Sequence, residues 1–183
     1  MNASWSYLYQ PSINQAVDDL QNSYNITSAV AAGNATPPAQ PDNTFWWSPA
    51  GCSYCIVLGG LNQGSDTRWA YSNYRVTFYA PAQWVEAAST TNQAIVPALG
   101  HDWFRSELGD CYNGAAPDGC TSGTSFAAPL AAGLIARYLQ SNPSATQWQI
   151  RAYLSAQSTA HVNVSVPEPG GSSAPILNMV DCQ

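Results

Sequence analysis

The sequence predicts an α/β fold built on a mainly parallel sheet, and three observations carry that prediction. Residues 2–5 and 26–32 are strand candidates, and an amphipathic pattern over about 12–24 predicts a helix between them. This strand, helix, strand order is the signature of a βαβ unit. The segments 26–32 and 55–59 are apolar with little polar alternation, as expected for buried strands of a parallel sheet. Finally, residues 130–139 are apolar on nearly all sides, which predicts a buried helix.

The composition limits the kind of partner that the chain can bind. The chain has 183 residues, of which 45% are hydrophobic and 11% aromatic, enough for the core of one domain. Only 9% of the residues are charged, the net charge is -6, and all five basic residues are arginines. Without a basic cluster there is no electrostatic footprint for nucleic acid or for an anionic membrane surface. We expect neither as a partner, and a peptide or small neutral substrate fits better.

Cysteines and glycosylation sequons favour an oxidising, secretory setting. The cysteines are Cys52, Cys55, Cys111, Cys120 and Cys182, and sequons begin at Asn2, Asn25, Asn34 and Asn163. Cys111 and Cys120 could join one loop, whereas Cys52 and Cys55 could form half of a zinc site, although neither histidine stands at a matching spacing. The odd number of cysteines leaves the pairing open. No signal peptide is visible at Met1, so secretion requires an upstream segment.

Ser125 stands where a turn of small residues, 118–123, meets the start of the apolar helix. Backbone N–H groups point outward at a helix N-terminus, and the helix dipole favours negative charge there. This position suits a nucleophilic serine. The alternative is that Ser125 only caps the helix, because serine and threonine are common caps and Pro129 is tolerated in a first turn.

The string Ser-Gly-Thr-Ser-Phe-Ala-Ala-Pro at 122–129 resembles the nucleophile motif of the subtilisin-like serine peptidases. Val-Ala-Ala-Gly-Asn at 30–34 resembles the strand of that family whose terminal asparagine donates to the oxyanion. By itself the Gly-Asn pair would indicate a turn. Two further blocks, Ser-Asn-Tyr at 72–74 and Ala-Pro at 80–81, follow in the order of the family.

The resemblance implies three layers, with helices on both faces of the sheet, and a serine endopeptidase that forms an acyl-enzyme. Ser125 would be the nucleophile, and the Asn34 side-chain amide and the Ser125 backbone N–H would stabilise the oxyanion. The substrate would lie between two strands, Ala31, Ala32 and Gly33 on one side and Ser4, Trp5 and Ser6 on the other. Because Asn34 also begins a sequon, a glycan there would block the site.

The aspartate and histidine of the family's triad are not found in the chain. In the family they precede the oxyanion asparagine, but no histidine precedes Asn34. The chain therefore resembles the C-terminal portion of the catalytic domain, a single partial domain over 1–183 with a long loop insertion at about 92–121. His101 and Asp102 are adjacent in that loop and would rarely point at one nucleophile. We expect the isolated chain to be inactive. Because a parallel sheet cut at a central strand exposes an unpaired edge, the chain alone should fold poorly or pair with something, for which the missing N-terminal part of the domain is a candidate.

Other segments carry weaker predictions. Residues 35–54 predict a loop whose aromatic run, Phe45, Trp46 and Trp47, either binds substrate or covers the core. A second helix is expected around 148–154, followed by a polar tail that contains His161. Arg75 and Ala82 stand where the family usually has glycines, so Arg75 must avoid a positive φ or bear its strain. No cofactor is expected, because the loop around 75–77 offers no carboxylate for a calcium site of the family type.

Two alternative functions stay open. The acid-acting sedolisin group shares the fold and a Gly-Thr-Ser motif, and it would suit a chain without lysine. That group is expected to use an aspartate for the oxyanion, whereas this chain has Asn34. The other alternative is a non-catalytic relic that acts as an interaction module, for which the missing aspartate and histidine argue. Retention of both Ser125 and Asn34 argues against it.

Overall fold

A computed structural model describes residues 1–35, 39–83, 85, 122–161 and 165–177. The chain divides into two compact units, Met1–Ala82 with Gly123–Gln183 as the first and Gln83–Ser122 as the second. Every helix and strand named below belongs to the first unit. The predicted insertion at 92–121, with His101 and the Cys111 and Cys120 pair, lies outside the described residues, as does Cys182.

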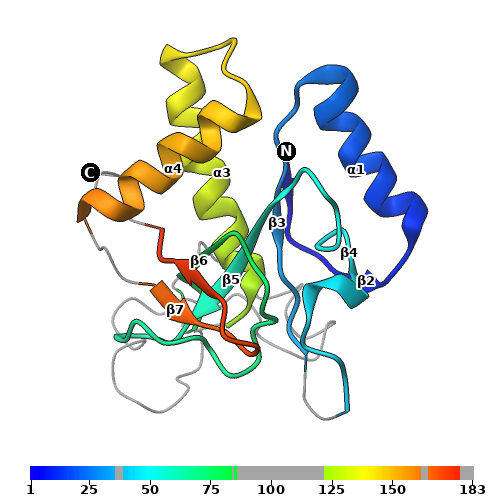
Figure 1. Ribbon diagram of the computed structural model, residues 1–183, viewed down its shortest axis with the longest axis vertical. Helices are drawn as coiled ribbons and strands as arrows, with labels where there is room; N and C mark the ends of the chain where they lie inside the picture. The colour runs from blue at the N-terminus through cyan, green and yellow to red at the C-terminus, as the bar shows by residue number, and fades with distance from the viewer. Residues whose placement is uncertain (36–38, 84, 86–121, 162–164, 178–183) are drawn as a thin grey trace, which may run out of the picture. The chain divides into compact units, whose positions relative to one another are not determined.

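Four parallel strands form the central sheet in the order β1-β3-β5-β6 (Figure 1). They are β1 (Asn2–Ala3), β3 (Ala29–Ala31), β5 (Ile56–Leu61) and β6 (Phe78–Pro81), with register pairs such as Ala3↔Val30 and Val30↔Val57. β3 and β5 are buried at every position, which explains their continuous apolar pattern. The predicted parallel sheet is confirmed. The strand predicted over 26–32 is shorter than expected, since β3 covers only Ala29–Ala31 and the Ile26 N–H bonds the Leu20 carbonyl at the end of α1.

Helices cover both faces of the sheet, as the resemblance implies. α3 (Thr124–Ser141) and α4 (Gln147–His161) lie on one face, and α1 (Pro11–Tyr24), which connects β1 to β3, lies on the other (Figure 1). Successive side chains of β3 point to opposite faces of the sheet and so pack against different helices. Ala29 and Ala31 belong to the core cluster formed with α3 and α4, whereas Val30 belongs to the cluster that includes Val17 of α1. Three layers result, with a hydrophobic cluster on each side of β3.

Three segments differ from the sequence-based predictions. The expected loop at 35–54 contains a 3-10 helix, η1 (Thr44–Trp46), and a strand, β4 (Trp47–Ser48), that pairs antiparallel with β2 (Tyr7–Leu8). α4 extends to His161, so this residue ends a helix instead of lying in a tail. Beyond it, β7 (Ser165–Pro167) and β8 (Ser173–Pro175) form a hairpin. Val166 and Ala174 of the hairpin are buried against Tyr79, which the polar composition of the segment concealed.

The aromatic run in the 35–54 segment is divided between two roles. Trp47 is buried, and its indole N–H donates to the carbonyl of Pro41 at 2.7 Å. Phe45 and Trp46 are about half exposed, and the Phe45 ring stacks on Tyr9 with ring centroids 5.8 Å apart. Only Trp47 therefore covers the core.

Cys52 and Cys55 form a disulfide, so the zinc alternative does not hold for this pair. Asp18 of α1 is buried, and its Oδ1 accepts the backbone N–H groups of Ser53 and Tyr54, at 2.9 and 2.8 Å. The loop between the two cysteines is thus held by a helix on one side and by the disulfide on the other. The described residues contain no cluster of metal-ligating side chains and no helix suited to crossing a membrane.

Arg75 adopts the left-handed conformation, with φ at 66°, and so bears the strain that its side chain brings there. Glu168 stabilises the turn: its Oε1 accepts the N–H groups of Arg75 at 2.8 Å and of Val76 at 3.2 Å. The same oxygen accepts the Tyr79 hydroxyl at 2.9 Å. Burial raises the pKa of the Tyr79 phenol, and the Glu168 carboxylate raises it further. The missing glycine is compensated by a buried carboxylate that the sequence did not reveal.

Candidate active site

Ser125 is the second residue of α3, which begins at Thr124 after Gly123. Its backbone N–H belongs to the first turn and has no partner among the described residues. Pro129 was expected in the first turn, but it lies in the second, where a proline cannot bond the carbonyl four residues earlier. That carbonyl belongs to Ser125, and the Ser4 hydroxyl donates to it at 2.9 Å. Because Pro129 has no N–H, the Ser125 carbonyl lacks its bond within the helix and accepts the Ser4 hydroxyl instead.

The bond between Ser4 and Ser125 is reciprocal. While the Ser4 hydroxyl donates to the Ser125 carbonyl, the Ser125 hydroxyl donates to the Ser4 carbonyl at 3.0 Å. The two residues are 121 positions apart in the chain. This pair of bonds fixes the residues after β1 beside Ser125, which remains only partly buried.

Asn34 follows β3 and lies beside the start of α3. Its Oδ1 accepts two hydrogen bonds from Thr124, one from the backbone N–H and one from the hydroxyl, both at 2.9 Å. With Oδ1 held in this way, the amide orientation is set and Nδ2 points away from Thr124. Nδ2 has no partner among the described residues, and the side chain is exposed.

The two unpaired donors face the same small space. The point that a Cβ atom of Gly123 would occupy lies 3.3 Å from Asn34 Nδ2 and 3.7 Å from the backbone nitrogen of Ser125. The φ of Gly123 is extended, so the backbone does not demand glycine here. A Cβ atom there would be in close contact with Asn34 Nδ2, so glycine leaves the point between the two donor nitrogens open. An oxygen with developing negative charge could bind there, next to the Ser125 hydroxyl.

The Asn73 side chain stabilises the turn at 32–35, which contains Asn34. Its Nδ2 donates to the Ala32 carbonyl at 2.8 Å and its Oδ1 accepts the Ala35 N–H at 3.1 Å, so one fully buried side chain bridges the turn. Gly33 has φ at 97°, and a Cβ there would lie 2.6 Å from Asn73 Nδ2. The Gly33 N–H also donates to the Thr124 hydroxyl at 3.1 Å. Thr124 and Asn73 were not recognised as site residues from the sequence, although Asn73 lies in the Ser-Asn-Tyr block.

The two predicted substrate strands differ in their free backbone groups. Ala31 and Ala32 are buried, and Gly33 is already bonded on both sides, through its N–H to Thr124 and through its carbonyl to the Asn73 N–H at 3.0 Å. By contrast, the backbone groups of Trp5 and Ser6 have no partner among the described residues. The open edge that could pair with an extended peptide is therefore the 4–6 segment.

No described residue brings a base to Ser125. The hydroxyl has one hydrogen bond, to the Ser4 carbonyl, which cannot accept and hold the proton during attack. His101 lies outside the described residues, and so does the side chain of His161 at the end of α4. The described part of the chain thus places a partly buried serine hydroxyl near two donor nitrogens, without a base that could take the hydroxyl proton.

The fold agrees with the family and the solved structures that the chain resembles. The Subtilase family (Peptidase_S8) matches residues 1–171, and the chain belongs to that family. Among solved structures, a cold adapted subtilisin-like serine proteinase has a TM-score of 0.68 and 23% identity, and the match covers 97% of this chain and 54% of that one.

Two further structures have the same fold. One, from Pseudoalteromonas arctica PAMC 21717, has a TM-score of 0.64 and 20% identity, covering 100% of this chain and 50% of that protease. The other, the S41 psychrophilic protease, has a TM-score of 0.63 and 20% identity, covering 96% and 54%. The chain spans about half the length of the structures that it matches.

Proposed function

We propose that this chain is the nucleophile-bearing portion of a serine endopeptidase that hydrolyses peptide bonds through an acyl-enzyme on Ser125. The observation that carries the proposal is the pair of unpaired donors, Asn34 Nδ2 and the Ser125 N–H, that face the space beside Gly123. Attack by Ser125 Oγ on a substrate carbonyl produces a tetrahedral intermediate whose oxyanion lies in that space. The amide of Asn34 and the helix N-terminus then stabilise the negative charge.

The substrate is a peptide in extended conformation, paired with the free backbone groups of Trp5 and Ser6. Support comes from the bond between Ser4 and Ser125, which places this segment directly beside the nucleophile. The site of action is extracellular, as the Cys52–Cys55 disulfide favours. No metal or cofactor enters the proposed chemistry.

The isolated chain is inactive in this proposal. Serine attack requires a base to take the hydroxyl proton and a carboxylate to orient that base, and the described residues offer neither at Ser125. In subtilisin itself, removal of the triad lowers kcat by a factor of about 2 × 10⁶. The missing part of the domain would supply both groups and would pair with the free edge of β1.

The test begins with the source transcript upstream of the Met1 codon, read in frame for an aspartate-containing strand and a histidine-containing helix. A chain extended to include them should react with a fluorophosphonate probe at a protease-like rate, and Ser125→Ala should abolish the labelling. The 183-residue chain alone should stay unlabelled. An extended chain whose labelling survives Ser125→Ala would rule out Ser125 as the nucleophile.

Two alternatives remain to be tested in the same experiment. A sedolisin-like mechanism would require labelling that increases in acid, but Asn34 is a neutral amide that donates without needing protonation. An interaction module would be favoured if the transcript starts at Met1, since the chain would then lack its base. The complete set of bonds around Asn34 and Thr124 favours the peptidase over either alternative.

A further inference from the structure

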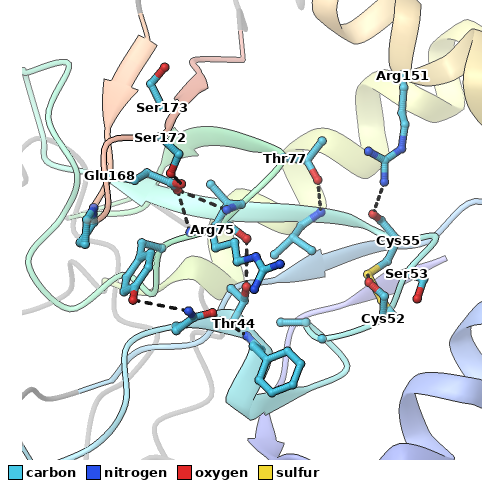
Figure 2. A pocket seen from close by; sticks show the side chains of 18 residues that line it. Thr44, Cys52, Ser53, Cys55, Arg75, Thr77, Arg151, Glu168, Ser172 and Ser173 are labelled. Carbon is cyan, nitrogen blue, oxygen red and sulfur yellow. Dashed lines mark hydrogen bonds between the residues drawn. A yellow bond between two sulfur atoms is a disulfide. The ribbon is translucent and has the colours of Figure 1, made fainter.

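A cavity of about 770 Å³ lies away from Ser125, between the 50–55 segment, the 74–77 turn, the β7–β8 hairpin and Arg151 of α4 (Figure 2). Its volume is within the range of about 300–1,000 Å³ that is common for small-ligand sites. Neither Ser125 nor Asn34 lines the cavity. It is therefore separate from the candidate active site.

Glu168 is the only carboxylate among the described residues that line the cavity, and the fold already uses both of its oxygens. Oε1 accepts the three hydrogen bonds from Arg75, Val76 and Tyr79, and Oε2 accepts the Ser172 hydroxyl at 3.1 Å. Figure 2 shows Glu168 and Ser172 together on one side of the pocket. This carboxylate stabilises a turn and has little capacity left for a cation.

The two arginines of the cavity have no counter-ion among the described residues. Arg151 is partly buried and reaches down from α4 to donate to the Cys55 carbonyl (Figure 2). Burial lowers the pKa of the Arg151 guanidinium, because no carboxylate offsets the lost hydration. The Arg75 guanidinium has no hydrogen bond or ion pair with a described residue. Arg68, outside the cavity, pairs with Asp42 at 3.6 Å.

We propose that this cavity binds a peptide through a carboxylate group, with Arg75 and Arg151 as the cationic partners. Two guanidinium groups and one carboxylate leave a net charge of +1 on the lining, which matches a single carboxylate better than a doubly charged phosphate. Ser53 and Ser173 add hydroxyl groups that have no partner among the described residues, and Phe45 supplies an apolar wall. The proposal concerns binding alone and is independent of Ser125 chemistry.

The test uses the 183-residue chain carrying Ser125→Ala, so that binding is measured without the Ser125 hydroxyl. Three probes are titrated by calorimetry: acetyl-Gly-Phe with a free C-terminus, the same dipeptide as its amide, and acetyl-Gly-Phe-Glu amide. Binding of the first but not of the third assigns the site to a C-terminal carboxylate, and the reverse result assigns it to an acidic side chain. Either result supports the proposal. Binding of the neutral amide with equal affinity, or no binding of any probe, overturns it.

Three variants locate the binding. Arg75→Gly removes one guanidinium and suits the left-handed backbone, and Arg151→Gln removes the other while retaining a donor for Cys55. Each should weaken binding by about tenfold or more, as expected for a charge-assisted hydrogen bond. Arg137→Gln, on α3 outside the cavity, removes the same charge and should leave the affinity unchanged. Equal losses in all three variants would show a nonspecific charge effect and would contradict the proposal.

Discussion

The turns at Gly33 and Arg75 both contain a residue with positive φ, but they differ in whether a side chain fits at that residue. Each contains a residue with positive φ, 97° at Gly33 and 66° at Arg75, and each is held by one buried polar side chain from a distant segment. At Gly33 the bracing Asn73 is in the way of any Cβ, and the turn holds Asn34 against Thr124 at the start of α3. At Arg75 the bracing Glu168 contacts only backbone N–H groups of the turn, so a side chain is accommodated at the expense of strain.

The difference between the two turns indicates which of them can accept a side chain in place of glycine. The turn that positions Asn34 depends on close side-chain contacts that leave no room for a Cβ, whereas the other turn needs only that its N–H groups stay paired. A divergent sequence can therefore lose the glycine at Arg75 and keep the one at Gly33. Variants at these two turns test the difference, beginning with the largest expected effect.

Removal of the Asn73 side chain should have the greatest effect. Asn73→Ala leaves the buried Ala32 carbonyl and Ala35 N–H without partners, and each unsatisfied group costs about 1–3 kcal/mol. We expect the free energy of unfolding to fall by about 3 kcal/mol in urea denaturation. Asn62→Ala is the matched control, since Asn62 bonds at the partly exposed 62–68 turn and should cost about 1 kcal/mol or less. Equal losses for the two variants would refute the bracing role.

Gly33→Ala should be the next most damaging change. The new Cβ would lie 2.6 Å from Asn73 Nδ2, and the backbone strain at this φ adds to the clash. We expect a loss of about 2 kcal/mol in the same denaturation assay, within the range for strained residues. Gly64→Ala separates the two causes, because Gly64 has φ at 67° but nothing within 4 Å of a Cβ. If Gly64→Ala destabilises as much as Gly33→Ala, the contact with Asn73 is not important.

The phenol of Tyr79 should make the chain sensitive to alkaline conditions. Its pKa is raised in the folded state, so above the unfolded value of about 10 the unfolded chain releases a proton that the folded chain keeps. Stability is fully present below that pH and declines as the pH rises. Tyr79→Phe should be less stable at neutral pH, by about 1 kcal/mol for the lost bond to Glu168. Thermal unfolding between neutral and alkaline pH should show a weaker decline for the variant; parallel declines would contradict this interpretation.

Arg75→Gly should be the smallest effect and should have the opposite sign. Glycine adopts positive φ without the Cβ penalty, so the folded state gains about 1 kcal/mol, reduced by the greater freedom of glycine in the unfolded chain. Thermal unfolding should show unchanged or slightly higher stability, while Arg75→Ala should give no gain. A clear loss of stability in Arg75→Gly would mean that the arginine side chain itself supports the turn.

Local patterns were enough to predict the parallel sheet and to single out Ser125 and Asn34 as candidate site residues, because each depends on a few adjacent residues or on the periodicity of single segments. Contacts across the chain were not predictable in this way. The bond between Ser4 and Ser125 spans 121 residues, and Glu168 reaches Arg75 from 93 residues away. The β7–β8 hairpin was missed because its strands bury one side chain each, Val166 and Ala174, within a composition of proline, glycine and serine.

The most direct test of the Ser125 and Asn34 assignment is the titration of the extended chain, which includes the base and its carboxylate, with a peptide boronic acid, followed by ¹¹B NMR. A boronic acid forms a tetrahedral adduct with a serine hydroxyl and places an oxygen in the oxyanion position, so it reports the site without turnover. We expect a tetrahedral signal that Ser125→Ala abolishes. Asn34→Asp should weaken the affinity by about tenfold or more, since it keeps an acceptor for Thr124 but loses the donor. A tetrahedral signal that survives Ser125→Ala, or an affinity unaffected by Asn34→Asp, would contradict the assignment.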